Sequence, residues 1–193
     1  MRDKDVDTAF DVVVYRPDTA SLWDGQFNGV ALQEWPDDFR QASQDRSISL
    51  VVPGSWSDYQ PIEPEDGNDW VGFFAAPNVA SYFDPWGTAP GLRVLWSNQR
   101  AEEHTTESYL SSLSYSEWAV DEAFVVESER FVGHAQWFVN PNDNWSIEYA
   151  VTVRGLEDSP LIVLYISDED YLVDGTSFRM LESLELDLPD PAG

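Results

Sequence analysis

The chain has 193 residues, with 36 acidic residues against ten basic ones and a formal net charge of -26. Hydrophobic residues make up 42% of the chain and aromatic residues 14%, which is enough for a packed core and excludes a disordered polyelectrolyte. A surface this acidic repels nucleic-acid phosphates and anionic lipid head groups, so neither is expected as a partner.

The sequence contains no cysteine, which excludes disulfides and cysteine-ligated metals. Its apolar runs are too short to span a bilayer as helices, and its first residues lack the apolar core of a signal peptide. We therefore expect a soluble chain, either cytoplasmic or the soluble part of a membrane-anchored or secreted protein. Acids spread over the folded region are typical of a halophilic surface, and a basic partner is the alternative explanation.

The N-terminal part of the chain has the least regular pattern. Residues 11–17 predict a short strand that ends at Pro17, and residues 34–46 predict a loop or a short helix. We divide the chain into a partly ordered N-terminal segment, 1–33, and a folded domain, 34–193.

From residue 47 onward, apolar runs alternate with turn residues and predict a series of strands. The expected strand regions are 47–53, 70–77, 91–97, 122–140 (two strands joined by a turn), 145–154 and 161–167. Capping residues predict short helices after Asn78, after Thr105 or Thr106, and after Ser167 or Asp168. Because strands joined by short turns pair antiparallel, we expect an α+β fold with a central antiparallel sheet flanked by helices.

The stretch DRSISLVVPGSWSDY, residues 45–59, ends a strand on Pro53-Gly54 and places Trp56 directly after the turn. It resembles the first strand of PsbP/Mog1-like domains, in which the form S-x-x-V-P-x-x-W begins the fold. Further segments similar to that family follow in its order, at 75–97, 129–138 and 161–186. The resemblance extends over roughly residues 34–188.

The closest form of the family is the C-terminal module of actinobacterial membrane-anchored proteins, some of them described as serine proteases. The resemblance implies an α/β/α sandwich around a central antiparallel sheet. It implies no catalytic residue, because members with known roles act as partners: assembly factors of photosystem II, or binders of a small GTPase. The cysteines that usually flank the hairpin of this module are absent from the chain.

Residues suited to catalysis or metal binding are few. His104 and His134 are the only histidines, no serine-nucleophile motif accompanies them, and we expect an exposed His104 and a strand-packing His134. Asp168 and Asp170 come nearest to a metal site, but their spacing is not that of a calcium loop, and capping of a helix explains them. We expect no catalytic site, metal or cofactor, and any protease activity would belong to another domain.

Three hypotheses for the function follow. The first is a non-catalytic interaction module for a basic protein partner, contacted through the acidic loop residues Glu63, Glu65, Asp66 and Asp69. The second is a domain that binds a small ligand, a cation or a carbohydrate through acidic loops and surface aromatics, with Trp56 and Trp86 as the aromatics beside the turns. The same two tryptophans are also expected to pack their turns against the sheet. The third is an enzyme with a carboxylate acid–base pair.

Overall fold

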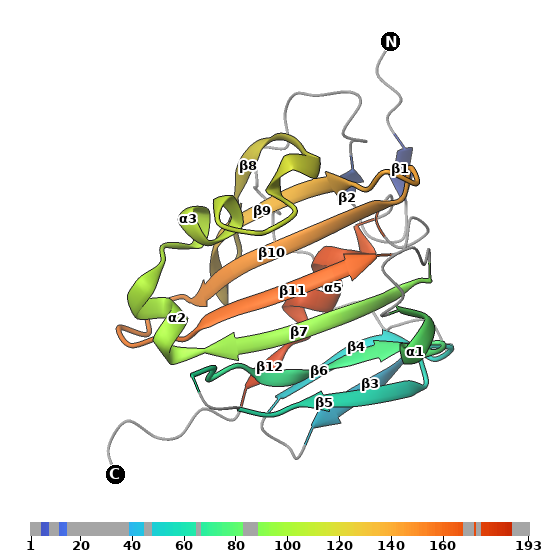
Figure 1. Ribbon diagram of the computed structural model, residues 1–193, viewed down its shortest axis with the longest axis horizontal. Helices are drawn as coiled ribbons and strands as arrows, with labels where there is room; N and C mark the ends of the chain where they lie inside the picture. Colours follow the sequence, from blue (N-terminus) through green and yellow to red (C-terminus); the bar gives the residue numbers. More distant parts are fainter. Residues whose placement is uncertain are drawn as a thin grey trace.

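The computed structural model describes residues 5–7, 12–14, 39–44, 48–64, 67–82, 89–167, 172 and 175–186, with side chains from residue 48 onward. Seven antiparallel strands form one large sheet in the order β5-β6-β7-β11-β10-β9-β8 (Figure 1). These strands are β5 (Asp58–Ile62), β6 (Val71–Ala76), β7 (Gly91–Ser97), β8 (Ala119–Glu127), β9 (Phe131–Val139), β10 (Trp145–Val153) and β11 (Leu161–Ser167).

The strand order divides the large sheet into two meanders. Strands β5, β6 and β7 follow one another along the chain and in space, and so do β8, β9, β10 and β11. The two meanders meet where β7 pairs with β11, with Gly91 opposite Ser167 and Ser97 opposite Leu161. The chain therefore leaves β7 in the middle of the sheet, reaches the far edge at β8, and returns strand by strand.

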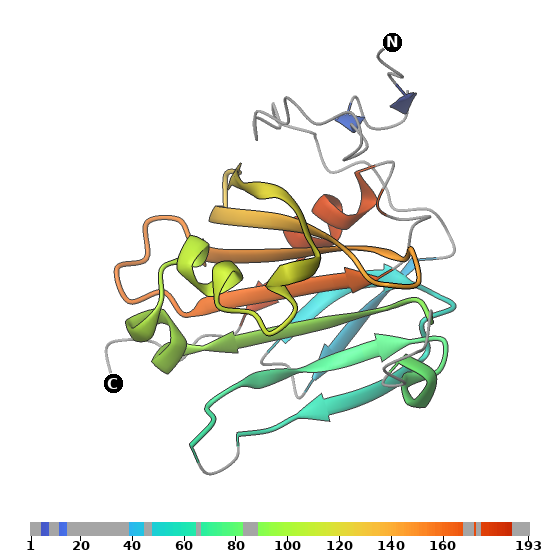
Figure 2. The same cartoon turned by 45° about the horizontal axis from the view of Figure 1, so that its top comes forward.

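A smaller sheet in the order β12-β4-β3 covers one face of the large sheet, together with helix α5 (Figure 2). Its strands are β3 (Phe39–Gln44), β4 (Ile48–Pro53) and β12 (Glu185–Leu186), and α5 spans Thr176–Glu182. Two further strands, β1 (Asp5–Asp7) and β2 (Val12–Val14), pair only with each other in the described part of the chain.

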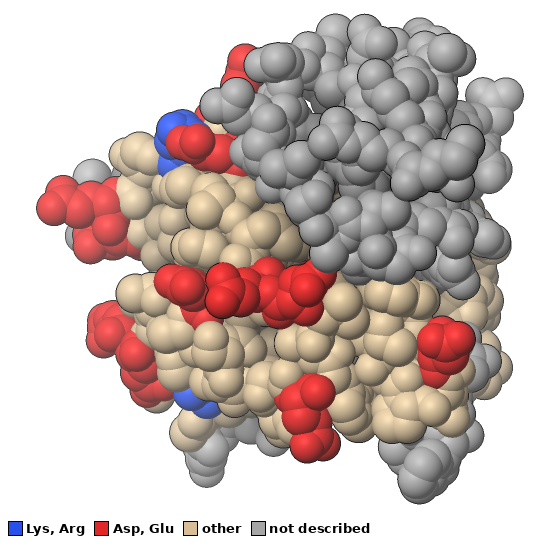
Figure 3. Space-filling model, turned by 90° about the horizontal axis from the view of Figure 1, so that it is seen from above, with Lys and Arg blue, Asp and Glu red and all other residues tan. Residues whose placement is uncertain are grey.

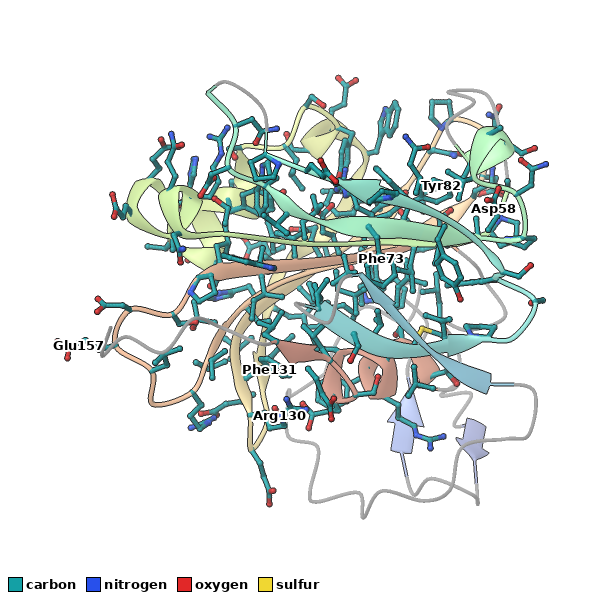
Figure 4. All side chains as sticks on the ribbon, turned by 90° about the horizontal axis from the view of Figure 1, so that it is seen from below. Asp58, Phe73, Tyr82, Arg130, Phe131 and Glu157 are labelled. Atoms are coloured by element: carbon teal, nitrogen blue, oxygen red, sulfur yellow. The ribbon has the colours of Figure 1, made fainter. Side chains whose placement is uncertain are left out.

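Short helices cover the opposite face of the large sheet. The helices that cover it are α2 (Asn98–Glu103) and α3 (Thr106–Ser111). Two further short elements are α1 (Val79–Tyr82), which follows β6, and the 3-10 turn η2 (Ser116–Trp118), which precedes β8. Seen from below in Figure 4, the large sheet lies between the helices on one side and the small sheet with α5 on the other, and Phe73 points into the space between the two sheets.

Alternation of side chains along each strand produces two cores. In β10, Ile147, Tyr149 and Val151 face the small sheet, where the main core also takes Trp56 and residues of α5. The next residue along, Ala150, faces the helices and joins the smaller core under α3. The central strand β11 is apolar on both faces because both are covered, as its continuous apolar run predicts.

The predicted α+β class and the antiparallel sheet are confirmed, and each predicted strand region from residue 47 onward contains the strand or strands expected there. The helix-flanked sandwich needs correction, because one face is covered largely by a second sheet and the described helices are short. The final helix that the structure describes begins at Thr176, with Gly175 as its N-cap; Asp168 lies outside the described residues.

Two strands differ from the prediction. A loop or short helix over 34–46 is wrong for Phe39–Gln44, which pair with β4 as strand β3. The composition of β3 is mostly polar, but backbone pairing with an apolar neighbour outweighs such a weak local preference. Strand β5 was missed because Pro61 breaks its pattern, and an edge strand tolerates proline.

The turn after β4 forms as its sequence predicts. The backbone N–H of Trp56 donates to the carbonyl of Pro53 over 2.9 Å, which reverses the chain. The Trp56 side chain is then 1% exposed and belongs to the main core. The turn therefore brings the Trp56 side chain back against the edge of the core. This explains why the tryptophan follows the Pro-Gly turn so closely in the sequence.

A substitution at Gly133 tests how closely β9 pairs with β10. A Cβ at this position would lie 2.2 Å from the carbonyl oxygen of Ala150, so Gly133→Ala must push the strands apart. We expect a loss of about 1–3 kcal/mol in the free energy of unfolding, as for other overpacked sites. Urea unfolding followed by tryptophan fluorescence measures this loss.

Gly155→Asn is the matched control, because an added Cβ there meets nothing within 4 Å and asparagine tolerates a φ of +79°. Equal unfolding midpoints for the two variants would contradict the close approach at Gly133.

Candidate functional site

A row of polar side chains crosses the helix-covered face of the large sheet. Arg93 of β7 lies directly opposite Tyr165 of β11. Tyr165 in turn lies opposite Glu148 of β10, and Glu148 lies opposite Gln136 of β9. Directly opposed residues share a face of the sheet, so the four side chains form one continuous line across four strands.

The carboxylate of Glu148 is fully buried and lies at the centre of this row. Arg93 Nη2 donates to its Oε1 over 3.1 Å, the Tyr109 hydroxyl donates to Oε1 over 3.4 Å, and the Tyr115 hydroxyl donates to Oε2. Arg93 also donates to the Tyr115 hydroxyl over 3.1 Å and lies 5.4 Å from the centroid of the Tyr165 ring. We call these five residues the Glu148 cluster.

The electrostatics of the Glu148 cluster keep Arg93 charged and keep the Tyr109 and Tyr115 hydroxyls protonated. Burial lowers the pKa of Arg93, but the Glu148 carboxylate and the neighbouring tyrosine hydroxyls together raise it more, so the guanidinium stays charged. Burial and then the charge of Glu148 raise the pKa of the Tyr109 and Tyr115 hydroxyls, which stay protonated and donate. The buried charge is therefore compensated by a cation and by phenol donors, which is the condition for a stable buried carboxylate.

The arrangement of the Glu148 cluster is suited to holding elements together. Tyr109 comes from α3 and Tyr115 from the segment before η2, and both reach down to a carboxylate in the middle of the sheet. Arg93 Nε is buried without a hydrogen-bond partner, although the Arg93 side chain as a whole is 25% exposed. Since carboxylate, guanidinium and hydroxyls bind one another, the cluster offers no free base or nucleophile. It fastens the helix layer to the sheet.

The predicted acidic loop does not act as one group. Glu63 is exposed, and Glu65 and Asp66 lie outside the described residues. Asp69 instead caps α2: its carboxylate accepts hydrogen bonds from the Ser97 hydroxyl and, over 2.9 Å, from the backbone N–H of Gln99. Partial burial raises the pKa of Asp69, but these hydrogen bonds outweigh it and hold the pKa below its ordinary value.

The predicted aromatic and metal residues are not brought together. Trp56 is enclosed by the main core and presents no surface to a ligand. Trp86, Asp168 and Asp170 lie outside the described residues. No group of three or more potential metal ligands gathers within the part of the chain that the structure describes.

The two histidines make local contacts with the helix layer. His134 lies on β9, as predicted, and its Nδ1 is 2.8 Å from the Thr106 hydroxyl oxygen at the start of α3. His104, which was expected to be exposed, is half-buried, and its ring packs edge-on against Tyr109. Within the described ranges, neither histidine forms an ion pair with a carboxylate.

One edge of the large sheet is formed by β8 (Figure 1). We call residues 116–129 the β8 edge. It contains five acidic residues and no basic one, and all five are exposed: Glu117, Asp121, Glu122, Glu127 and Glu129. Val125, in the same segment, is 54% exposed. Figure 3 looks down on this end of the molecule, where acidic side chains recur across the surface and basic ones are few.

No family model matches the sequence, and no curated protein matches it. Among the described helices, none has the length and apolar character needed to cross a bilayer. The resemblance to PsbP/Mog1-like domains therefore stays a prediction.

The Glu148 cluster predicts strong coupling between its two charges. Arg93→Met leaves the buried carboxylate without its cation, and we expect a loss of about 3–5 kcal/mol in the free energy of unfolding. The double variant Arg93→Met/Glu148→Leu removes both charges and should recover at least half of this loss. Urea unfolding of both single variants and the double variant measures the coupling; strictly additive losses would contradict it.

The buried tyrosines predict a loss of stability at alkaline pH. Because the pKa values of Tyr109 and Tyr115 are raised in the folded protein, the unfolded chain ionises first, near its ordinary pKa of about 10. Their contribution to stability is complete below about pH 10 and is lost as the pH rises further. Urea unfolding at a series of alkaline pH values should show a shallower decline for Tyr115→Phe than for the native chain. Identical declines would argue against the raised pKa of Tyr115.

Proposed function

We propose that the chain is a non-catalytic module that binds another protein through its acidic surface, and that the partner surface is basic. The observation that carries the proposal is that each arginine whose side chain is described is engaged by other groups of the chain or buried, while most of the described acids are exposed.

The engaged arginines support this imbalance in detail. Three of them pair with carboxylates: Arg93 with Glu148, Arg100 with Glu103, and Arg154 with Glu127. Arg130 donates to the backbone oxygen of Glu182 over 2.7 Å, and Arg179 is buried in α5. Among the residues whose side chains are described, these contacts leave most surface carboxylates without an arginine partner, and such a field speeds encounter with a basic protein.

A non-catalytic role is supported by the structural roles of two carboxylates, those of Glu148 and Asp69. Glu148 holds the helix layer to the sheet, and Asp69 caps a helix. Both are satisfied by internal donors. The proposal also agrees with the resemblance to PsbP/Mog1-like domains, since members of that family with known roles bind proteins.

The hypothesis of a small-ligand, cation or carbohydrate site has less support. It needs aromatic side chains on the surface, and Trp56, one of its two tryptophans, is enclosed in the core. The carboxylate of Asp69, in the acidic loop, is also occupied by the hydrogen bonds that cap α2, so it is not available to a ligand.

A pull-down tests the proposal. The chain is immobilised and exposed to lysate of its source at low and at molar salt, beside an acidic control protein of matched net charge. We expect one basic protein to be enriched on the chain and absent from the control, and its association rate, measured with purified proteins, to fall as salt rises. Proteins shared with the control, all lost at molar salt, would instead identify the acidity as a surface adaptation.

A further inference from the structure

Building on the proposed binding of a basic protein, we propose that β8 is its docking edge: an extended basic segment of the partner pairs with β8 as an eighth strand of the large sheet. The observations that support this are the backbone of β8, its exposed valine and its acids.

The hairpin register leaves backbone groups of β8 directed away from β9. At the turn, the N–H of Ser128 donates to the carbonyl of Phe131 over 2.9 Å. Bonded and non-bonded pairs alternate along an antiparallel ladder. Val126 therefore bonds to β9, whereas the N–H and C=O groups of Val125 and Glu127 point outward from the sheet. Such outward groups are a template for an added strand.

The opposite edge of the large sheet is protected, whereas β8 has no second neighbouring strand among the residues that the structure describes. Strand β5 contains Pro61, which has no N–H to offer a neighbour. The β5 residue Asp58 also accepts a hydrogen bond over 2.9 Å from the backbone N–H of Val79, at the start of α1 (Figure 4). Strand β8 has no proline, and within the described residues no helix is fastened to it by a hydrogen bond of this kind.

A bulge limits the open edge to one short segment. The β8–β9 register shifts between Val120 and Phe124, and Asp121 within the shift has a φ of 61°. The side-chain amide of Gln136 donates to the carbonyl oxygens of Val120 and Asp121, over 3.3 and 2.9 Å, and so holds the bulge in place. The regular part of β8 is thus Phe124–Glu127, next to the turn. Bulges of this kind keep an edge from pairing indiscriminately.

The negative charge of the β8 edge favours a basic segment as the added strand. Pairing two copies of this chain through β8 would bring their five acids against each other, which disfavours a homodimer at this edge. A segment with lysine or arginine is attracted instead, and the chain already contains one such contact: Arg154 Nη2 lies 2.7 Å from Glu127 Oε1. The exposed side chain of Val125 offers an apolar contact to a residue of the incoming strand.

The test uses a labelled eight-residue peptide of alternating lysine and valine, added to the isotope-labelled full chain at low salt. We expect binding to slow hydrogen exchange at the Val125 and Glu127 amides, since both point to the added strand. A peptide with every amide N-methylated keeps its charge but donates no backbone hydrogen bond, and it should bind at least about tenfold more weakly. Equal binding of the two peptides would overturn the strand pairing.

Two matched variants test whether the peptide binds at β8 rather than at the opposite edge of the sheet. Val125→Lys adds a positive charge on β8, and Gln60→Lys adds the same charge on the exposed strand β5. We expect about a tenfold loss of peptide affinity for the first and little change for the second, because a lysine on an edge blocks a basic neighbour. Neutralising Glu117, Glu122 and Glu129 should likewise weaken binding more than neutralising Glu63, Glu65 and Asp66.

The outcomes separate this inference from the proposed function. A basic partner that binds without protecting the β8 amides, or that depends on the 62–69 loop instead, overturns the docking edge and leaves the proposed function standing. Protection of the same amides by a second copy of the chain, without any peptide, overturns the docking edge in favour of self-association. If the basic peptide does not bind and the pull-down enriches no basic partner, both proposals fail.

Discussion

The buried carboxylate of Glu148 is the constraint on which the arrangement of the layers depends. A charge at the centre of the sheet is costly to bury, and the fold compensates it with a cation from β7 and with hydroxyls from α3 and the segment before η2. Each donor comes from a different part of the chain. Satisfying this one carboxylate therefore fixes where α3 and the segment before η2 lie on the sheet. Exposed acids such as Glu63 are compensated by water and salt instead.

The sequence predicts the strands well and the polar contacts poorly. The run 161–167 is apolar throughout, so its central place in the sheet follows from composition alone. Thr105 likewise predicts the start of α3, and it forms the expected cap with Ser108. Arg93 and Glu148 are each a single charged residue in an apolar strand, and nothing local relates them. Their pairing depends on a register across three strands, which is a property of the whole sheet.

Prediction of the functional residues from the sequence was limited in the same way. The loop 62–69 was chosen for its density of acids, but density does not distinguish a capping carboxylate such as Asp69 from a solvated one such as Glu63. Trp56 was correctly expected to pack its turn, and the same packing removes it from the surface. The β8 edge was missed because an edge is defined by the absence of a neighbouring strand. Its signal in the sequence is only a run of acids around Val125 without a base.

The two meanders of the large sheet also have a consequence for how the chain folds. Within each meander, strands pair with close neighbours in sequence, so each can form rapidly from local hairpins. Joining β7 to β11 must instead close a long loop, because Gly91 and Ser167 are far apart in the chain. Arg93 contributes from one meander and Glu148 and Tyr165 from the other, so the Glu148 cluster is completed only at this joining step. The meanders can therefore collapse early, while the barrier to folding lies at their junction, where a carboxylate must lose its water as its cation arrives.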